Sequence, residues 1–317
     1  MSVLTNISFL ILSIFTLVIG AERFVDSSSK IAKNYGISEL FVGLTIIALG
    51  TSAPEIFVAI SSVINSAESV AVGTIVGSNI TNIALIFGIS CFAITQIKSR
   101  FSLESLIPFL LSFLLFLLAL KDLRFSVIES LGFIMIFCYF LVIISKERSN
   151  NVEIISGSND IFKSSMLLVL GLILLVVGSN FTVIYAERFA LSIGISEVVV
   201  GLTILALGTS LPELAATITA MIKGKNQIVI GNIIGSNILN LVIIVPIIGI
   251  FSKSTMPSEL WERDSTTLII LTLIFAAIIL FLSRAQIPKL IGTFLGLGFI
   301  GFYVIYVLNL SNLISIF

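Results

Sequence analysis

Ten long apolar segments, separated by short polar stretches, dominate the pattern of hydrophobic positions along the chain. Most hold about 18–25 residues, which is enough for a helix to cross a bilayer. The longer ones fit tilted helices or helices interrupted by Gly and Pro. The pattern predicts an all-α membrane protein with ten transmembrane helices, at residues 4–21, 39–64, 70–96, 103–120, 125–145, 166–186, 197–222, 227–251, 266–283 and 288–310.

The composition agrees with a membrane protein. Hydrophobic residues make up 57% of the chain and charged residues 11%, against about 25% charge in soluble domains, and the mean hydropathy is +1.20. The net charge of zero gives no indication of nucleic-acid binding, and the absence of His excludes His-based catalysis and His metal sites. Cys91 and Cys138 both lie in apolar runs, so we expect packing residues rather than a disulfide or a metal pair. The first segment lacks a basic leader and a cleavage site, and is interpreted as a true span.

One stretch of twenty residues occurs twice. Residues 36–55 read GISELFVGLTIIALGTSAPE and residues 194–213 read GISEVVVGLTILALGTSLPE, with 16 of 20 positions identical at an offset of 158. A second pair keeps the same offset: residues 73–82 read GTIVGSNITN and residues 231–240 read GNIIGSNILN. The chain is therefore predicted to consist of two repeats.

The repeats set the domain organisation. We expect a first five-helix repeat at 1–148 with its motif at 43–82, a cytoplasmic linker at 149–163, and a second five-helix repeat at 164–317 with its motif at 201–240. Because five is odd, the second repeat enters the membrane in the opposite orientation. The two GTSxPE segments should then face each other near the midplane on antiparallel helices.

Each GTSxPE segment combines a helix break with oxygen ligands. Pro54 has no N–H and forces a kink or an unwound turn, which frees carbonyls near Ala48 and Gly50. Hydroxyl, carbonyl and carboxylate oxygens suit hard cations such as Na⁺ and Ca²⁺. With the GSNxxN helices, the candidate ion-binding residues are Ala48, Thr51, Ser52, Glu55, Ser78 and Asn82 in the first repeat, and Ala206, Thr209, Ser210, Glu213, Ser236 and Asn240 in the second.

The charges of the apolar segments point the same way. Among 17 acidic residues, only Glu55 and Glu213 lie deep within predicted spans, and all 17 Lys and Arg lie at span ends or in loops. Burying each acid costs roughly 2.5 kcal/mol or more. Without a buried basic partner, the acids must be protonated or neutralised by bound cations, and the surrounding oxygens favour cations.

The distribution of Lys and Arg predicts the orientation. The loops joining spans 1–2, 3–4, 5–6, 7–8 and 9–10 hold twelve of these residues, and the opposite side holds five. By the positive-inside rule the richer side is cytoplasmic. We therefore expect a multi-pass protein of the cell (inner) membrane with both termini extracytoplasmic.

At these motifs the chain resembles the cation/calcium antiporter superfamily, specifically its prokaryotic-type sodium/calcium exchanger branch. GTSAPE with GSNITN, and GTSLPE with GSNILN, match the two alpha repeats of that family in identity, order and spacing. The resemblance covers the whole chain. It implies antiport of Na⁺ against Ca²⁺ by alternating access, with the first and sixth spans sliding across the other eight.

The resemblance also implies roles for the candidate residues. Glu55 and Glu213 would share Ca²⁺, and Thr51 and Thr209 would add backbone carbonyls. The Na⁺ sites would be completed by Ser52, Ser78, Ser210, Ser236 and the carbonyls of Ala48 and Ala206. Asn82 and Asn240 would line the centre; some relatives, including potassium-dependent exchangers, carry Asp there, so the two Asn argue against K⁺ co-transport.

Energetics favour three Na⁺ per Ca²⁺. With a tenfold Na⁺ gradient and 100 mV, three Na⁺ supply about 6.5 kcal/mol, including about 2.3 from the net charge moved. Two Na⁺ supply only about 2.8 kcal/mol, whereas a 10⁴-fold Ca²⁺ gradient needs about 5.5 kcal/mol. Two carboxylates would balance one Ca²⁺ and leave a net charge of +1 with three Na⁺, so the cycle is expected to be electrogenic.

Three alternatives stay open at this point. The two glutamates could titrate in an H⁺/Ca²⁺ antiporter, since burial raises a carboxyl pKa, or they could form the selectivity ring of a passive cation channel. An enzyme is least favoured, because Ser and Glu lack an oriented base. We expect no cofactor, and no partner beyond Na⁺ and Ca²⁺ as substrates and the lipid bilayer; no protein partner is implied.

Overall fold

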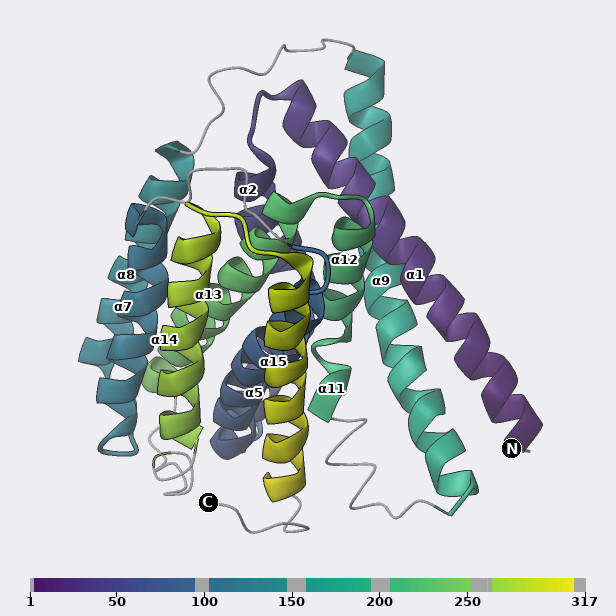
Figure 1. The fold of residues 1–317 in the computed structure, drawn as a ribbon. Coiled ribbons are helices and arrows are strands. Elements are labelled where there is room, and N and C mark those ends of the chain that lie inside the picture. Colours follow the sequence, from purple (N-terminus) through teal and green to yellow (C-terminus); the bar gives the residue numbers. More distant parts are fainter. Residues whose placement is uncertain are drawn as a thin grey trace.

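The computed structural model describes residues 3–94, 103–146, 158–194, 206–251, 261 and 264–310, and these residues fold almost entirely into helices (Figure 1). Two of the helical segments, η1 and η2, are π-helices, which occur preferentially at functional sites. In chain order the elements are α1 (Val3–Asn34), α2 (Glu39–Val42), η1 (Gly43–Ile47), α3 (Ala48–Thr51), α4 (Ala53–Ile64), α5 (Glu68–Ile80), η2 (Thr81–Phe87), α6 (Gly88–Ser90), α7 (Leu103–Leu120), α8 (Val127–Lys146), α9 (Ser158–Ser192), α11 (Ala206–Gly208), α12 (Leu211–Ile222), α13 (Asn226–Phe251), α14 (Ser265–Leu282) and α15 (Lys289–Leu310).

The predicted all-α membrane fold is confirmed, and the count of ten spans stays a prediction. Among the described residues, seven helices are long and apolar enough to cross a membrane, and the pair Glu39–Thr51 and Ala53–Ile64, bent by 45°, is an eighth candidate. Two shorter apolar helices, Leu106–Leu120 and Leu211–Ile222, fall within the predicted fourth and seventh spans.

The two longest helices extend well beyond their apolar segments. The first predicted span ends at residue 21, but α1 continues to Asn34 and includes Arg23. The sixth was predicted at 166–186, but α9 runs over Ser158–Ser192 and takes in the end of the predicted linker. Residues 149–157 of that linker lie outside the described part of the chain. Helix length therefore exceeds the hydrophobic length here, because charged residues such as Arg and Glu are good helix formers.

α13 lies inside the molecule, and α1 and α9 lie together at one side of it (Figure 1). α13 contacts α5, α8, α12 and η1 and is buried over most of its length. Its sequence is apolar or small nearly all round, which is typical of a buried helix. The thiols of Cys91 and Cys138 are both free.

Residues 158 apart adopt the same backbone conformation at three separate places. Gly36 and Gly194 both have positive φ, +64° and +89°. Ser52 and Ser210 have φ, ψ of −81°, 2° and −86°, 3°. Ser66 and Gly224 both have positive φ, 55° and 69°. The sequence repeat is therefore also a repeat of local structure.

The contact between α1 and α9 has the same reciprocal relation. Gly20 of α1 lies directly against the backbone of Leu174 and Leu175, and Gly178 of α9 lies against the backbone of Thr16 and Leu17. Thr16, Leu17 and Gly20 are each 158 residues before Leu174, Leu175 and Gly178. Glycine at both positions allows the two helix backbones to approach closely.

Ion pairs connect the charged half of α1 to the turn after α12. Lys223 Nζ lies 3.2 Å from Glu22 Oε1 and 2.5 Å from Asp26 Oδ2, and Lys225 Nζ lies 3.3 Å from Asp26 Oδ1. The positions related to these four by the repeat are Asn180, Ile184, Asn65 and Ala67. This ion-pair cluster therefore joins the two repeats and has no counterpart at the repeat-related positions.

Lys223→Gln is expected to lower the free energy of unfolding by up to about 1 kcal/mol, the usual range for a partly exposed ion pair. Partial burial lowers the pKa of Lys223, but hydrogen bonds to Asp26 and Glu22 outweigh it and raise that pKa above the ordinary lysine value. A raised lysine pKa contributes stability that is present below the ordinary value and is lost only as pH rises through the raised one. Thermal unfolding should show the same difference from wild type at pH 6 and pH 9. The exposed Lys289→Gln is the control, and an equal loss there would refute this role for the cluster.

Candidate functional site

The site begins at two matching helix breaks. In each repeat a Ser precedes a short helix whose second residue is Pro and whose third is Glu: Glu55 in α4 and Glu213 in α12. Because Pro lacks an N–H, the preceding turn cannot continue the helix. Both glutamates lie in the first helical turn, where the positive end of the helix dipole favours a carboxylate. Each side chain is only 1% exposed.

The serines of each repeat reach the glutamate of the other. Ser52 Oγ donates to Glu213 Oε1 at 2.9 Å, and Ser210 Oγ donates to Glu55 Oε1 at 3.5 Å. Ser78 Oγ of α5 also donates to Glu55 Oε1, at 3.3 Å. The motifs predicted to meet across the repeats are thus in direct contact.

The second carboxylate oxygens have no protein partner. Glu55 Oε2 and Glu213 Oε2 are buried without a hydrogen bond, as are both side-chain polar atoms of Asn82 and Oδ1 of Asn240. Buried polar atoms are normally paired, so these four oxygens are available to a ligand. No Lys or Arg among the described residues is buried, so no buried basic side chain there balances the negative charge of the site.

The remaining candidate residues lie around this pair of acids. Thr51 Oγ1 lies 3.3 Å from the Ala48 carbonyl oxygen and 3.5 Å from Ser236 Oγ. Thr209 is half-buried and directly precedes Ser210, and Asn240 Nδ2 donates to Asn79 Oδ1 at 3.3 Å. Ala206 begins α11, two residues before the carbonyl of Gly208, which accepts from Ser179 Oγ at 3.3 Å.

The donor set is poor in charged groups. Among the described residues, no cluster of three or more His, Cys, Asp or Glu could hold a metal ion. The site combines two carboxylates with hydroxyls, amides and backbone carbonyls, which are hard oxygen ligands of the kind that Na⁺ and Ca²⁺ prefer. It contains no thiolate or imidazole, the ligands that soft and borderline metals prefer.

A cavity lies beside the site. Its volume is about 430 Å³ and its wall includes Thr209, together with residues of α4, α9 and α11: Pro54, Phe57, Val58, Val176, Ser179, Asn180, Val183 and Gly208. Through Pro54 and Thr209 the cavity adjoins both helix breaks of the site.

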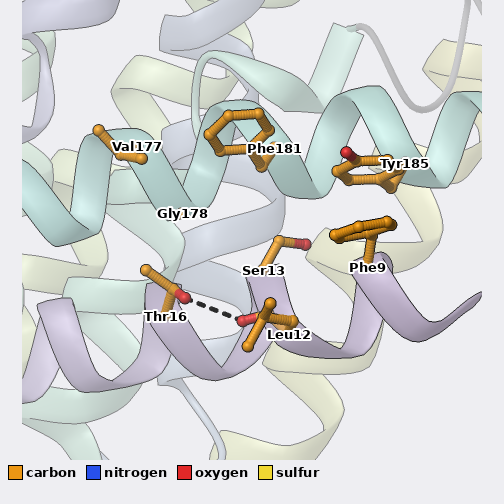
Figure 2. Close-up of a pocket in the computed structure, with 8 residues that line it drawn as sticks. All are labelled: Phe9, Leu12, Ser13, Thr16, Val177, Gly178, Phe181 and Tyr185. Atoms are coloured by element: carbon orange, nitrogen blue, oxygen red, sulfur yellow. Dashed lines mark hydrogen bonds between the residues drawn. The ribbon is translucent and has the colours of Figure 1, made fainter. Parts of the chain in front are cut away.

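A second hollow is apolar and separate from the acids. It holds about 290 Å³ between α1 and α9, and Figure 2 shows Phe9 and Tyr185 at one end of it, where their rings stack with centroids 5.0 Å apart. The hydroxyl of Thr16 donates a hydrogen bond to the Leu12 carbonyl oxygen at 2.9 Å. This hollow offers no charged ligand and is not the ion site.

Sequence reasoning missed one residue of the site, Asn232. Its side chain is 1% exposed and hydrogen-bonds Thr51, Thr217 and the backbone of Glu213. A comparison of the two repeats contains the signal, because position 74 is Thr where position 232 is Asn.

Comparisons with known proteins agree with this geometry. The sequence profile described as sodium/calcium exchanger protein matches residues 5–146 and 163–311. The putative antiporter CaxA of Alkalimonas amylolytica is 33% identical, over 93% of this chain and 96% of the relative. The sodium/calcium exchanger MaX1 of Methanosarcina acetivorans is 28% identical, over 95% and 98%. A solved structure of the sodium-calcium exchanger NCX_Mj superposes with a TM-score of 0.81 at 28% identity, covering 96% of this chain and 98% of that one.

Proposed function

Because the chain belongs to the sodium/calcium exchanger protein family, we propose that it is a secondary antiporter that exchanges Na⁺ for Ca²⁺ by alternating access. The family consists of transporters rather than enzymes. The observation that carries the proposal is the pair of buried glutamates, one from each repeat, whose Oε2 atoms have no protein partner. A transported cation supplies the missing partner in each loaded state.

The proposed ligands are those that the resemblance to the family implies. We assign Ca²⁺ to Glu55 and Glu213 with the backbone carbonyls of Thr51 and Thr209. The Na⁺ sites beside these two acids are completed by Ser52, Ser78, Ser210, Ser236 and the carbonyls of Ala48 and Ala206. Na⁺ and Ca²⁺ thus compete for the same two acids, and this competition is what couples the two fluxes. Asn82 and Asn240 line the centre with their unpartnered amide oxygens.

We also propose that the two repeats are inverted. The conformations repeated at an offset of 158 residues and the reciprocal packing of Gly20 and Gly178 support a two-fold relation between them, and an odd number of spans in each repeat puts that axis in the membrane plane. With five spans in each repeat, both termini lie on the extracytoplasmic side of the cell membrane. The cluster of Lys223 and Lys225 then lies on the cytoplasmic side.

Electrogenic exchange of three Na⁺ for one Ca²⁺ is the stoichiometry we propose. Proteoliposomes that contain the protein and are loaded with Ca²⁺ should produce a current when Na⁺ is added outside, because each cycle moves one net positive charge inward with the Na⁺. Current recorded on supported proteoliposome membranes tests this. Ca²⁺ movement without current would refute three-to-one coupling.

H⁺/Ca²⁺ antiport is the second candidate. It is favoured by the same buried acids, since a carboxyl buried near another carboxyl binds a proton readily. The hydroxyls hydrogen-bonded to the acids favour Na⁺ as the coupling ion instead. Ca²⁺ movement driven by a pH step, with none driven by Na⁺, would establish the proton-coupled alternative.

A further inference from the structure

Asn232 joins the two repeats on one side of the ion site. It lies in α13, and its Oδ1 accepts from Thr51 Oγ1 at 3.2 Å. Its Nδ2 donates to Thr217 Oγ1 at 3.0 Å and to the backbone carbonyl of Glu213 at 3.4 Å. The carbonyl can only accept, so this bond fixes which end of the amide carries the donor. One side chain thus connects the broken segment of the first repeat to the first turn of α12.

The other side of the site has no equivalent connection. In the first repeat, Thr74 stands at the position equivalent to Asn232, and Ala59 stands at the position equivalent to Thr217. Thr74 Oγ1 donates at 2.8 Å to the carbonyl of Val70 on its own helix. The methyl side chain of Ala59 cannot accept a hydrogen bond. Both members of the connection have therefore changed together between the repeats.

The consequence is that the two acids are held unequally. Glu213 is fixed through its backbone by Asn232 and through its carboxylate by Ser52 at 2.9 Å. The hydroxyls on Glu55 are more distant, at 3.3 Å from Ser78 and 3.5 Å from Ser210. A ligand that is already fixed loses less conformational entropy when an ion binds.

We propose that Asn232 is a positioning residue that preorganises the Thr51–Glu213 half of the site and sets apparent ion affinity more than turnover. The proposal rests on the antiport function above and deepens it. Asn232 does not touch the ion. It acts through Thr51 and Glu213, so the predicted signature is a change in half-saturation at a nearly constant maximal rate.

The test exchanges the repeat-related residues in the full-length protein. Asn232→Thr should raise the Ca²⁺ concentration for half-maximal exchange about tenfold with the maximal rate within about twofold, as expected for loss of more than one buried hydrogen bond. Thr217→Ala, which leaves Asn232 in place, should raise it about threefold. Thr74→Asn, the matched control, should leave it within about twofold.

A second readout needs no transport. Each purified variant is melted over a series of Ca²⁺ concentrations, and the concentration that gives half of the thermal stabilisation should shift in the same order. Wild-type half-saturation in Asn232→Thr, or an equal shift in Thr74→Asn, would overturn the proposal. If wild type itself shows no Na⁺-dependent Ca²⁺ exchange, the antiport function fails, and the melting series still decides whether Asn232 positions the ligands. Should Asn232→Thr not fold, Thr217→Ala carries both measurements.

Discussion

Glu213→Gln and Glu55→Gln are each expected to reduce Na⁺-dependent Ca²⁺ exchange at least about 30-fold. The substitution keeps the shape of the side chain but removes one of the two negative charges that balance Ca²⁺. Removing one partner of a buried charge pair costs about 2–5 kcal/mol, and no Lys or Arg among the described residues lies buried to rebalance the charge. Exchange is measured as ⁴⁵Ca²⁺ flux into proteoliposomes at equal amounts of inserted protein.

The matched control is Glu104→Gln, the same chemical change on the exposed first turn of α7. It should exchange at the wild-type rate. If Glu213→Gln retained wild-type exchange, the carboxylate would not be an ion ligand, and the site assignment would have to be abandoned.

Gly235→Ala is expected to lower the free energy of unfolding by about 1–3 kcal/mol, the usual cost of overpacking a core. A Cβ at this position would lie 2.6 Å from the Leu44 carbonyl oxygen and 2.7 Å from Ala48 Cβ. Backbone atoms cannot rotate away as a side chain can. The displaced turn includes Ala48, so ion affinity should fall together with the melting temperature.

The repeat supplies the control for this prediction. Gly77 is 158 residues before Gly235, and a Cβ built on it meets no heavy atom within 4 Å. Gly77→Ala should therefore melt at or above the wild-type temperature, because alanine is also the better helix former. Equal melting temperatures for the two variants would show that the contact between α13 and the segment around Leu44 is not tight.

The repeat made the acids of the site predictable from sequence alone. Two copies of GTSxPE at a constant offset identified Glu55 and Glu213, and the structure gives them matching helix breaks, burial and hydroxyl partners. A break at Pro is a local property of the chain. Apolar helices were predictable for the same reason, since hydrophobic length is read directly from sequence, whereas the count of ten spans stays a prediction.

The features that depend on packing could not be predicted in this way. Asn232 belongs to the site because it departs from the repeat, and only its contacts with Thr51 and Glu213 show the purpose of that departure. The extension of α1 to Asn34 was also missed, because a hydropathy pattern ends where charges begin, although Asp26 remains helical and pairs with Lys223. The roles of the twelve candidate ligands stay predictions.

The most direct test of Na⁺/Ca²⁺ antiport at this site is ⁴⁵Ca²⁺ uptake into proteoliposomes loaded with Na⁺, compared with vesicles loaded with K⁺ and with vesicles subjected to a pH step. We predict uptake that requires internal Na⁺ and is lost in Glu213→Gln. Uptake driven by the pH step alone would replace Na⁺ by H⁺ as the coupling ion, and uptake indifferent to both gradients would contradict antiport altogether.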